Sequence, residues 1–128
     1  MARAFNILLV EDNDNDALLF ALGIKNLAVS VTRAPDAPQA IHRLSSKRRL
    51  PDLIVLDPSL PGMSAHQFLE WTSRSKPAIQ KIPIVIYTGG VIVEDALKSM
   101  VRATFFKPSR LVEIQATVQQ MCMLVAHD

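Results

Sequence analysis

Short, uninterrupted apolar runs limit the folds that are open to this chain. Three of them stand out, at Phe5–Val10 (FNILLV), Leu53–Leu56 (LIVL) and Ile84–Tyr87 (IVIY). Each run is too short for a typical helix, so each is predicted to be a strand. Strands that are apolar at every position have both faces covered, which is typical of a parallel sheet with helices on either side.

Two weaker runs and five helix-like segments complete the pattern. We expect two more strands, at Leu27–Thr32 and Thr104–Phe106. Two of the expected helices begin at caps, at Asp14 or Asn15 and at Ser64. Another opens at Pro35–Pro38, a short one lies around Glu94–Met100, and the last begins near Pro108–Ser109. This alternation predicts an α/β fold, a doubly wound (βα)5 sandwich with the flavodoxin-like strand order 2-1-3-4-5.

Length and composition indicate one globular domain over residues 1–128. Apolar residues make up 49% and charged residues 20% of the chain, and the net charge of +2 is too small to indicate direct nucleic-acid binding. The single cysteine, Cys122, cannot form an internal disulfide, and the apolar run that ends at Val10 has no cleavage site after it. We therefore expect a cytoplasmic protein with no membrane insertion.

Reactive side chains directly follow four of the five expected strands. They are Glu11, Asp12, Asp57, Thr88 and Lys107. Because the carboxyl ends of parallel strands share one edge of the sheet, where ligands bind, we expect these side chains to lie together. Neighbouring carboxylates repel one another, and a divalent cation with oxygen ligands, such as Mg²⁺, removes the conflict.

These groups suit phosphoryl transfer, which relies mainly on positioning and charge neutralisation. Asp57 is the candidate nucleophile and would form an aspartyl phosphate. Lys107 supplies a compact positive charge that would pair with Asp57 and then with a phosphoryl oxygen. Thr88 would donate a hydrogen bond to another of those oxygens.

Four segments in order resemble the landmarks of bacterial receiver domains, the chemotaxis-regulator-like modules of two-component signalling. They are ILLVEDN, LIVLDPSLPGM, Tyr87-Thr88-Gly89 and Phe106-Lys107-Pro108. The resemblance covers nearly the whole chain. It implies that Asp57 takes a phosphoryl group from a histidine kinase or a histidine phosphotransfer protein, and that a downstream protein partner reads the result.

The same resemblance implies a metal site and a class of activity. Asp12 and Asp57 would bind Mg²⁺, with Glu11 beside them and the backbone carbonyl of Ser59 completing the protein ligands. The Lys107–Pro108 bond is a candidate cis peptide. The protein would be a signalling module and not an enzyme, although it would catalyse its own phosphorylation and dephosphorylation.

The chain departs from the family pattern where the signal leaves the site. The switch and output residues would be Thr88, Thr104 and Phe105, but Thr104 stands where the family usually has an aromatic residue or histidine. Strand alternation points Phe105 away from the side that Thr104 faces. The interval from Thr88 to Lys107 is also shorter than usual, and Pro58 removes a backbone donor. Our hypothesis is normal phosphorylation with a modified output surface.

Other functions stay open at this stage. The serious rival is a pseudo-receiver, a protein-binding module that works without phosphorylation, as the short segment before Lys107 would allow. A phosphatase of the haloacid dehalogenase type would need a second acid where Ser59 stands. A flavodoxin would need a loop rich in serine, threonine and glycine after the first strand.

The ends of the chain suggest how it is used. The chain is either a standalone regulator, which Met1 favours, or a piece of a longer protein. Residues 11–16 (EDNDND) resemble the opening of small regulators that are paired with sensor kinases such as phytochromes. The last helix carries apolar residues away from its core face, which are a candidate homodimer or partner surface: Val112, Ala116 and Met123.

Overall fold

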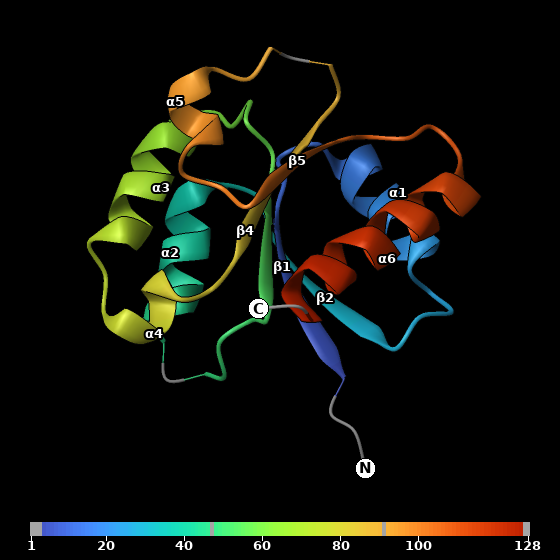
Figure 1. Cartoon of the computed structure of the whole chain (residues 1–128), viewed down its shortest axis with the longest axis horizontal. Coiled ribbons are helices and arrows are strands. Elements are labelled where there is room, and N and C mark those ends of the chain that lie inside the picture. Colours follow the sequence, from blue (N-terminus) through green and yellow to red (C-terminus); the bar gives the residue numbers. More distant parts are fainter. Residues whose placement is uncertain (1–3, 47, 91, 127–128) are drawn as a thin grey trace.

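The computed structural model describes residues 4–46, 48–90 and 92–126, and it contains a parallel five-stranded sheet with helices on both faces (Figure 1). The strand order is β2-β1-β3-β4-β5, which confirms the α/β fold and the order predicted from the sequence. The strands are β1 (Phe5–Val10), β2 (Val29–Ala34), β3 (Leu53–Leu56), β4 (Ile84–Thr88) and β5 (Ala103–Phe106).

Helices cover the sheet in two layers. In Figure 1, α1 and α6 lie on one side of the sheet, and α2, α3, α4 and α5 lie on the other. Within the described ranges, no helix has the length and apolar character needed to cross a membrane. The helices are α1 (Asp14–Gly23), α2 (Ala37–Ser45), α3 (Ala65–Ser73), α4 (Pro77–Gln80), α5 (Asp95–Lys98) and α6 (Leu111–Ala126).

The central strands are apolar at every position because each face of the sheet meets its own hydrophobic core. Leu8 and Val10 of β1 join the core beneath α2 and α3, whereas Ile7 and Leu9 join the core beneath α1 and α6. Successive side chains of a strand point to opposite faces, so a run without polar residues feeds both cores. Full burial of each such side chain contributes roughly 1.5–3 kcal/mol. The two cores therefore hold the central strands between the two helical layers.

Local signals set most helix starts. Ser64 caps α3 as predicted, because its hydroxyl accepts a hydrogen bond from Gln67 N at 3.1 Å while the Gln67 side chain accepts one from Ser64 N at 2.9 Å. The predicted cap of α1 at Asp14 or Asn15 is wrong. Asn13 is the cap, and its side chain accepts a hydrogen bond from Asp16 N at 2.9 Å.

Three further features differ from the sequence prediction. Strand β2 lies two residues later than expected, because it pairs along its length with β1 from Phe5↔Val29 onward. The connection that starts at Pro77 forms α4, where the proline suits a first helical turn. No described peptide bond is cis, so the predicted cis bond at Lys107–Pro108 is wrong, and this bond has the trans form that most X–Pro bonds prefer.

The contact between α1 and α6 is too close at Gly23 for any side chain. A Cβ atom there would lie 2.5 Å from Cγ2 of Ile114. We expect Gly23→Ala to lower the free energy of unfolding by about 1–3 kcal/mol, as overpacking does. Urea unfolding followed by circular dichroism measures this.

Gly89→Ala is the matched control, since its Cβ would meet nothing closer than Lys107 Cδ at 3.7 Å. It should change the unfolding free energy much less. A Gly23→Ala protein as stable as the parent would contradict the close packing of α1 on α6.

Candidate functional site

The site residues predicted from the sequence lie at one edge of the sheet. Glu11 and Asp12 follow β1, Asp57 follows β3, Thr88 ends β4, and Lys107 follows β5. Backbone pairing continues to these positions, because Asp57 N donates to the carbonyl of Val10 at 3.0 Å and Lys107 N donates to that of Thr88 at 2.7 Å. The pairing of the strands therefore fixes the backbone positions of Asp57 and Lys107 relative to each other.

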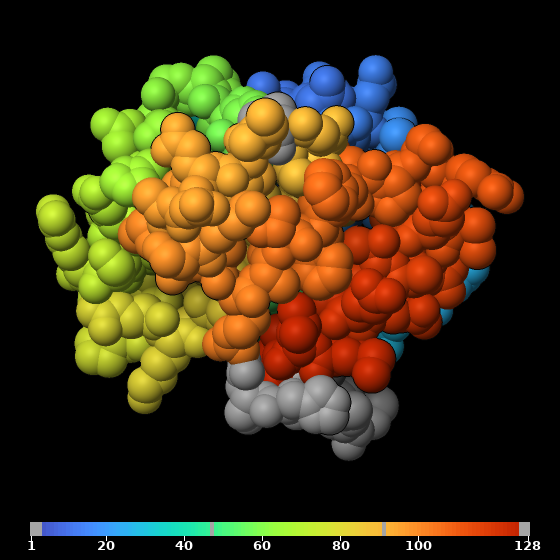
Figure 2. All heavy atoms as spheres, turned by 45° about the horizontal axis from the view of Figure 1, so that its top comes forward, coloured from blue at the N-terminus to red at the C-terminus, as the bar shows by residue number. Residues whose placement is uncertain are grey.

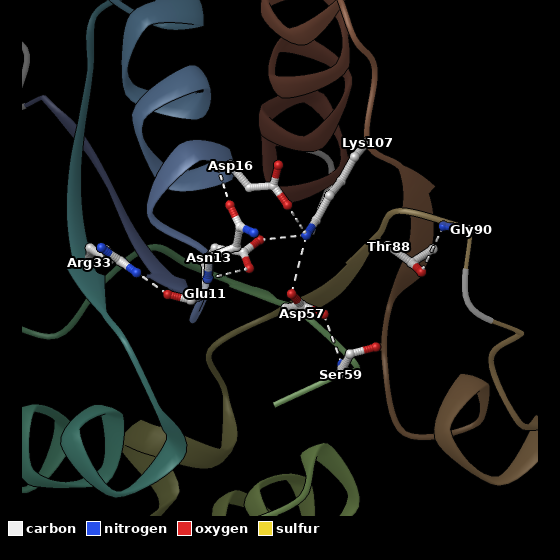
Figure 3. Close-up of polar contacts among 9 residues, drawn as sticks. All are labelled: Glu11, Asn13, Asp16, Arg33, Asp57, Ser59, Thr88, Gly90 and Lys107. Carbon is white, nitrogen blue, oxygen red and sulfur yellow. Dashed lines mark hydrogen bonds and ion pairs between the residues drawn. The ribbon is translucent and has the colours of Figure 1, made fainter. Parts of the chain in front are cut away.

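The ammonium group of Lys107 lies among three carboxylates (Figure 3). Its Nζ atom is 2.6 Å from Glu11 Oε1, 2.9 Å from Asp16 Oδ2 and 3.1 Å from Asp57 Oδ2. The Lys107 side chain is only 12% exposed, and that of Asp57 8%. Water therefore screens these charges little, and the lysine holds together acids that would otherwise repel one another.

The loop that carries the first two acids is held by main-chain contacts. Asn13 N donates to Glu11 Oε2 at 3.2 Å. Arg33 of β2 donates through Nε to the backbone carbonyl of Glu11 at 2.9 Å, and its Nη1 atom lies 2.7 Å from Asp14 Oδ1. Arg33 therefore ties this loop to the edge strand of the sheet.

Burial and contact between the acids shift their proton affinities in opposite directions. Burial, and next a hydrogen bond with Asp57, raise the pKa of Glu11 to about 8 against the opposing effect of Lys107. Burial also acts to raise the pKa of Asp57, but hydrogen bonds from Glu11 and Ser59 N and the charge of Lys107 hold that pKa below its usual value. Of the two acids, Glu11 is therefore the one that holds a proton more tightly, and Asp57 is an anion at neutral pH.

Lys107 keeps its charge in this setting. Burial alone would lower the pKa of its ammonium group, but its hydrogen bonds to Glu11 and Asp16 raise that pKa above the ordinary value. The ammonium also lies 5.9 Å from the centroid of the Tyr87 ring. The site therefore holds a permanent cation beside Asp57.

The acids fit a divalent cation. Glu11, Asp12 and Asp57 each offer an oxygen, and these oxygens lie within 4.8 Å of one another. Glu11 Oε1 is buried and forms an ion pair of 2.6 Å with Lys107 Nζ. Converging carboxylate oxygens are suitable ligands for a hard cation such as Mg²⁺. The predicted fourth ligand, Ser59, has its N–H directed to Asp57 Oδ1 at 2.8 Å.

Two of the three predicted switch residues, Thr88 and Thr104, line a hollow of about 320 Å³ together with Phe106. Thr88 is buried, and its hydroxyl accepts a hydrogen bond from Gly90 N at 3.4 Å. Phe105 packs instead against the core beneath α1 and α6, in the direction that strand alternation predicts. The exposed aromatic residue on the side of Thr104 is therefore Phe106, which is 71% exposed.

Sequence reasoning missed two residues of the site. Asp16 contacts Lys107 from the first turn of α1, and its position on a helix that leaves the same edge was the available signal. Arg33 directly follows the strand that was predicted at Leu27–Thr32, so the rule that identified Lys107 would also have selected it. The structure extends β2 through Arg33 to Ala34.

Sequence and structure comparisons with known proteins agree on one family, that of response regulators. The sequence model of the response regulator receiver domain matches residues 7–119. The probable methanogenesis regulatory protein FilR2 of Methanothrix harundinacea is 29% identical over 126 residues, which cover 91% of this chain and 81% of that protein.

Two solved structures have similar folds. The Mn²⁺-bound form of the response regulator Rcp1 is 25% identical, with a TM-score of 0.76 and 91% of each chain covered. The phosphorylated cyanobacterial phytochrome response regulator RcpA is also 25% identical, with a TM-score of 0.78, and the match covers 93% of this chain and 91% of that one.

Tyr87 gives a direct test of burial beside the site, because it is the only tyrosine in the chain. Its ring meets Phe20 edge to face at 5.5 Å, and burial raises the pKa of Tyr87 to about 12 from 10.0. The folded state therefore favours the neutral phenol, and this contribution to stability is complete below pH 10 and is lost as the pH rises toward 12.

Absorbance of the tyrosinate ion against pH measures the ionisation. We expect a midpoint near 12 in the native protein and near 10 in urea. A midpoint near 10 while circular dichroism still reports the native fold would contradict the burial of Tyr87.

Proposed function

The chain belongs to the response regulator receiver domain family, and from that premise we propose that it accepts a phosphoryl group on Asp57. The contact that carries the proposal is the ion pair of 3.1 Å between Asp57 and Lys107, set among further carboxylates. It supplies an ionised nucleophile and a fixed cation at the same point. Such a pair is suited to receiving a group that brings negative charge of its own.

The proposed reaction transfers the phosphoryl group from a phosphohistidine of a sensor kinase or phosphotransfer protein. A carboxylate oxygen of Asp57 forms the new P–O bond as the P–N bond breaks, and the electron pair of that bond returns to the imidazole nitrogen. The lowered pKa of Asp57 keeps the attacking oxygen unprotonated at neutral pH. The N–H of Ser59 orients the carboxylate by donating to its Oδ1 atom at 2.8 Å.

Other residues of the chain balance the charge of the product. Lys107 exchanges part of its contact with Asp57 for a phosphoryl oxygen, while Asp16 and Glu11 hold its ammonium near that position. Thr88 would donate its hydroxyl to another oxygen. Glu11, Asp12, Asp57 and the carbonyl of Ser59 would hold Mg²⁺, which when bound neutralises charge on the acids and on the transferred group.

The proposed partners follow from this chemistry. The donor is a histidine kinase or a histidine phosphotransfer protein, and a downstream protein reads the altered surface in the cytoplasm. Two similar proteins support the proposal, since Rcp1 was solved in a Mn²⁺-bound form and RcpA in a phosphorylated form. The candidate homodimer surface is also available, because Val112 and Met123 of α6 are 65% and 60% exposed.

A binding module that works without phosphorylation is the second candidate. The observation that favours it is α5, which lies at the molecular surface (Figure 2) and forms only a single turn, Asp95–Lys98. A binding module of this kind would take up no phosphate, so a phosphorylation assay separates the two candidate functions.

We expect the protein to take up one phosphoryl group when it is incubated with acetyl phosphate and Mg²⁺. Mass spectrometry of the intact chain measures the uptake. Asp57→Ala should abolish it, because the nucleophile is lost. Asp95→Ala is the matched control, since Asp95 is an exposed acid on α5, and it should leave uptake unchanged. Failure of the parent protein to gain mass would favour the second candidate.

We expect the signal to leave through the hollow beside Thr88. Beryllofluoride with Mg²⁺ should shift the amide NMR resonances of Thr88 and Gly90 most, and those of Thr104 and Phe106 by less, because Thr104 is short and offers little leverage. A large reorientation of β5 would contradict the modified output surface. Asp57→Ala should show none of these shifts.

A further inference from the structure

A basic surface lies along the sheet edge beside α2 and shares Arg33 with the candidate functional site. A hollow of about 430 Å³ is lined by Arg33, His42, Arg43 and Arg48. A second hollow of about 280 Å³ shares Arg43 and Arg48 with it and adds Arg49. We call these five residues and the two adjoining hollows the basic trough. It gathers four arginines in a chain whose net charge is only +2.

The two arginines at the centre of the trough, Arg43 and Arg48, are not paired with an acid among the described residues. No hydrogen bond or ion pair of the Arg43 or Arg48 side chain is found among the described residues, although Arg43 is partly buried. Asp36 also lines the trough, but its carboxylate caps α2 by accepting from Gln39 N at 2.8 Å. Arg33 pairs with Asp14 at the far end. Two guanidinium groups at the middle are therefore available to an external anion.

The trough runs along an open strand edge. β2 is the outermost strand and pairs only with β1 in the described part of the chain. The carbonyls of Ala28 and Ala34 accept hydrogen bonds from β1, so by the alternation of a strand the backbone groups of Val31 and Arg33 point outward. Among residues 4–46, 48–90 and 92–126, no other element forms a backbone hydrogen bond with the outward-facing groups of Val31 or Arg33. The edge can therefore accept another strand.

We propose that the basic trough and the β2 edge together bind an extended acidic segment of a partner protein. Such a segment would pair its main chain with Val31 and Arg33, and every second side chain would then point to the α2 face, above Arg43 and Arg48. Arginine suits this role because its planar guanidinium forms paired hydrogen bonds with a carboxylate. The trough has no phenylalanine, tyrosine or tryptophan lining it, which disfavours a single-stranded nucleic acid that would stack its bases.

The test uses the whole chain and a fluorescent peptide of alternating glutamate and valine. We expect salt-sensitive binding by fluorescence anisotropy, weakened roughly tenfold or more by the double substitution Arg43→Glu and Arg48→Glu. The matched control is Arg74→Glu with Lys81→Glu, two exposed cations on the α3–α4 side, and it should bind as the parent does. Circular dichroism establishes that both proteins fold, and Arg43→Gln with Arg48→Gln replaces the first variant if it does not.

Amide exchange separates strand pairing from simple charge attraction. On addition of the peptide, exchange at Val31 and Arg33 should slow, while exchange at the already paired Thr32 should change little. No binding, equal loss in the control variant, or unchanged exchange at Val31 and Arg33 would each overturn the proposal. Tighter binding of a single-stranded oligonucleotide through the same arginines would overturn it in favour of nucleic acid.

Discussion

The ion-pair cluster around Lys107 is the interaction on which the rest of the site depends. One ammonium contacts Glu11, Asp16 and Asp57 within 3.1 Å, at the point where three strands end. The cluster forms only because parallel pairing brings β1, β3 and β5 to one edge in fixed register. Burial acts to raise the pKa of Asp57, but hydrogen bonds from Glu11 and Ser59 N, together with the charge of Lys107, hold that pKa below its usual value.

The described site carries more negative than positive charge, which suits it to bind a cation. Acids outnumber the cation even when Glu11 holds a proton, and the oxygens of Glu11, Asp12 and Asp57 converge. In the proposed reaction, a divalent cation would offset this excess of negative charge, and the site would then more readily receive a phosphoryl group, which brings negative charge of its own. The two hydrophobic cores hold the acids in place while they repel one another, which a flexible loop could not do.

The apolar runs were enough to predict the sheet. Contacts between segments that are far apart along the chain could not be predicted from local patterns. Runs such as LIVL are buried on both faces, so strands β1 and β3 were predicted at their observed bounds. The bounds of β2 were shifted because its register depends on β1. In the site, Asp57 and Lys107 followed from strand ends, but Asp16 required knowledge of where α1 turns. Helix direction is set by tertiary packing, which a local pattern does not contain.

The most direct test of this account is where a paramagnetic cation binds. Mn²⁺, added far below the protein concentration, should first broaden the amide NMR signals next to Glu11, Asp12 and Asp57, and excess Mg²⁺ should restore them. This result would establish that the converging acids are a metal site whose charge Lys107 partly balances. Broadening centred on other acids, such as Asp36 or Asp95, or no broadening at all, would contradict the account.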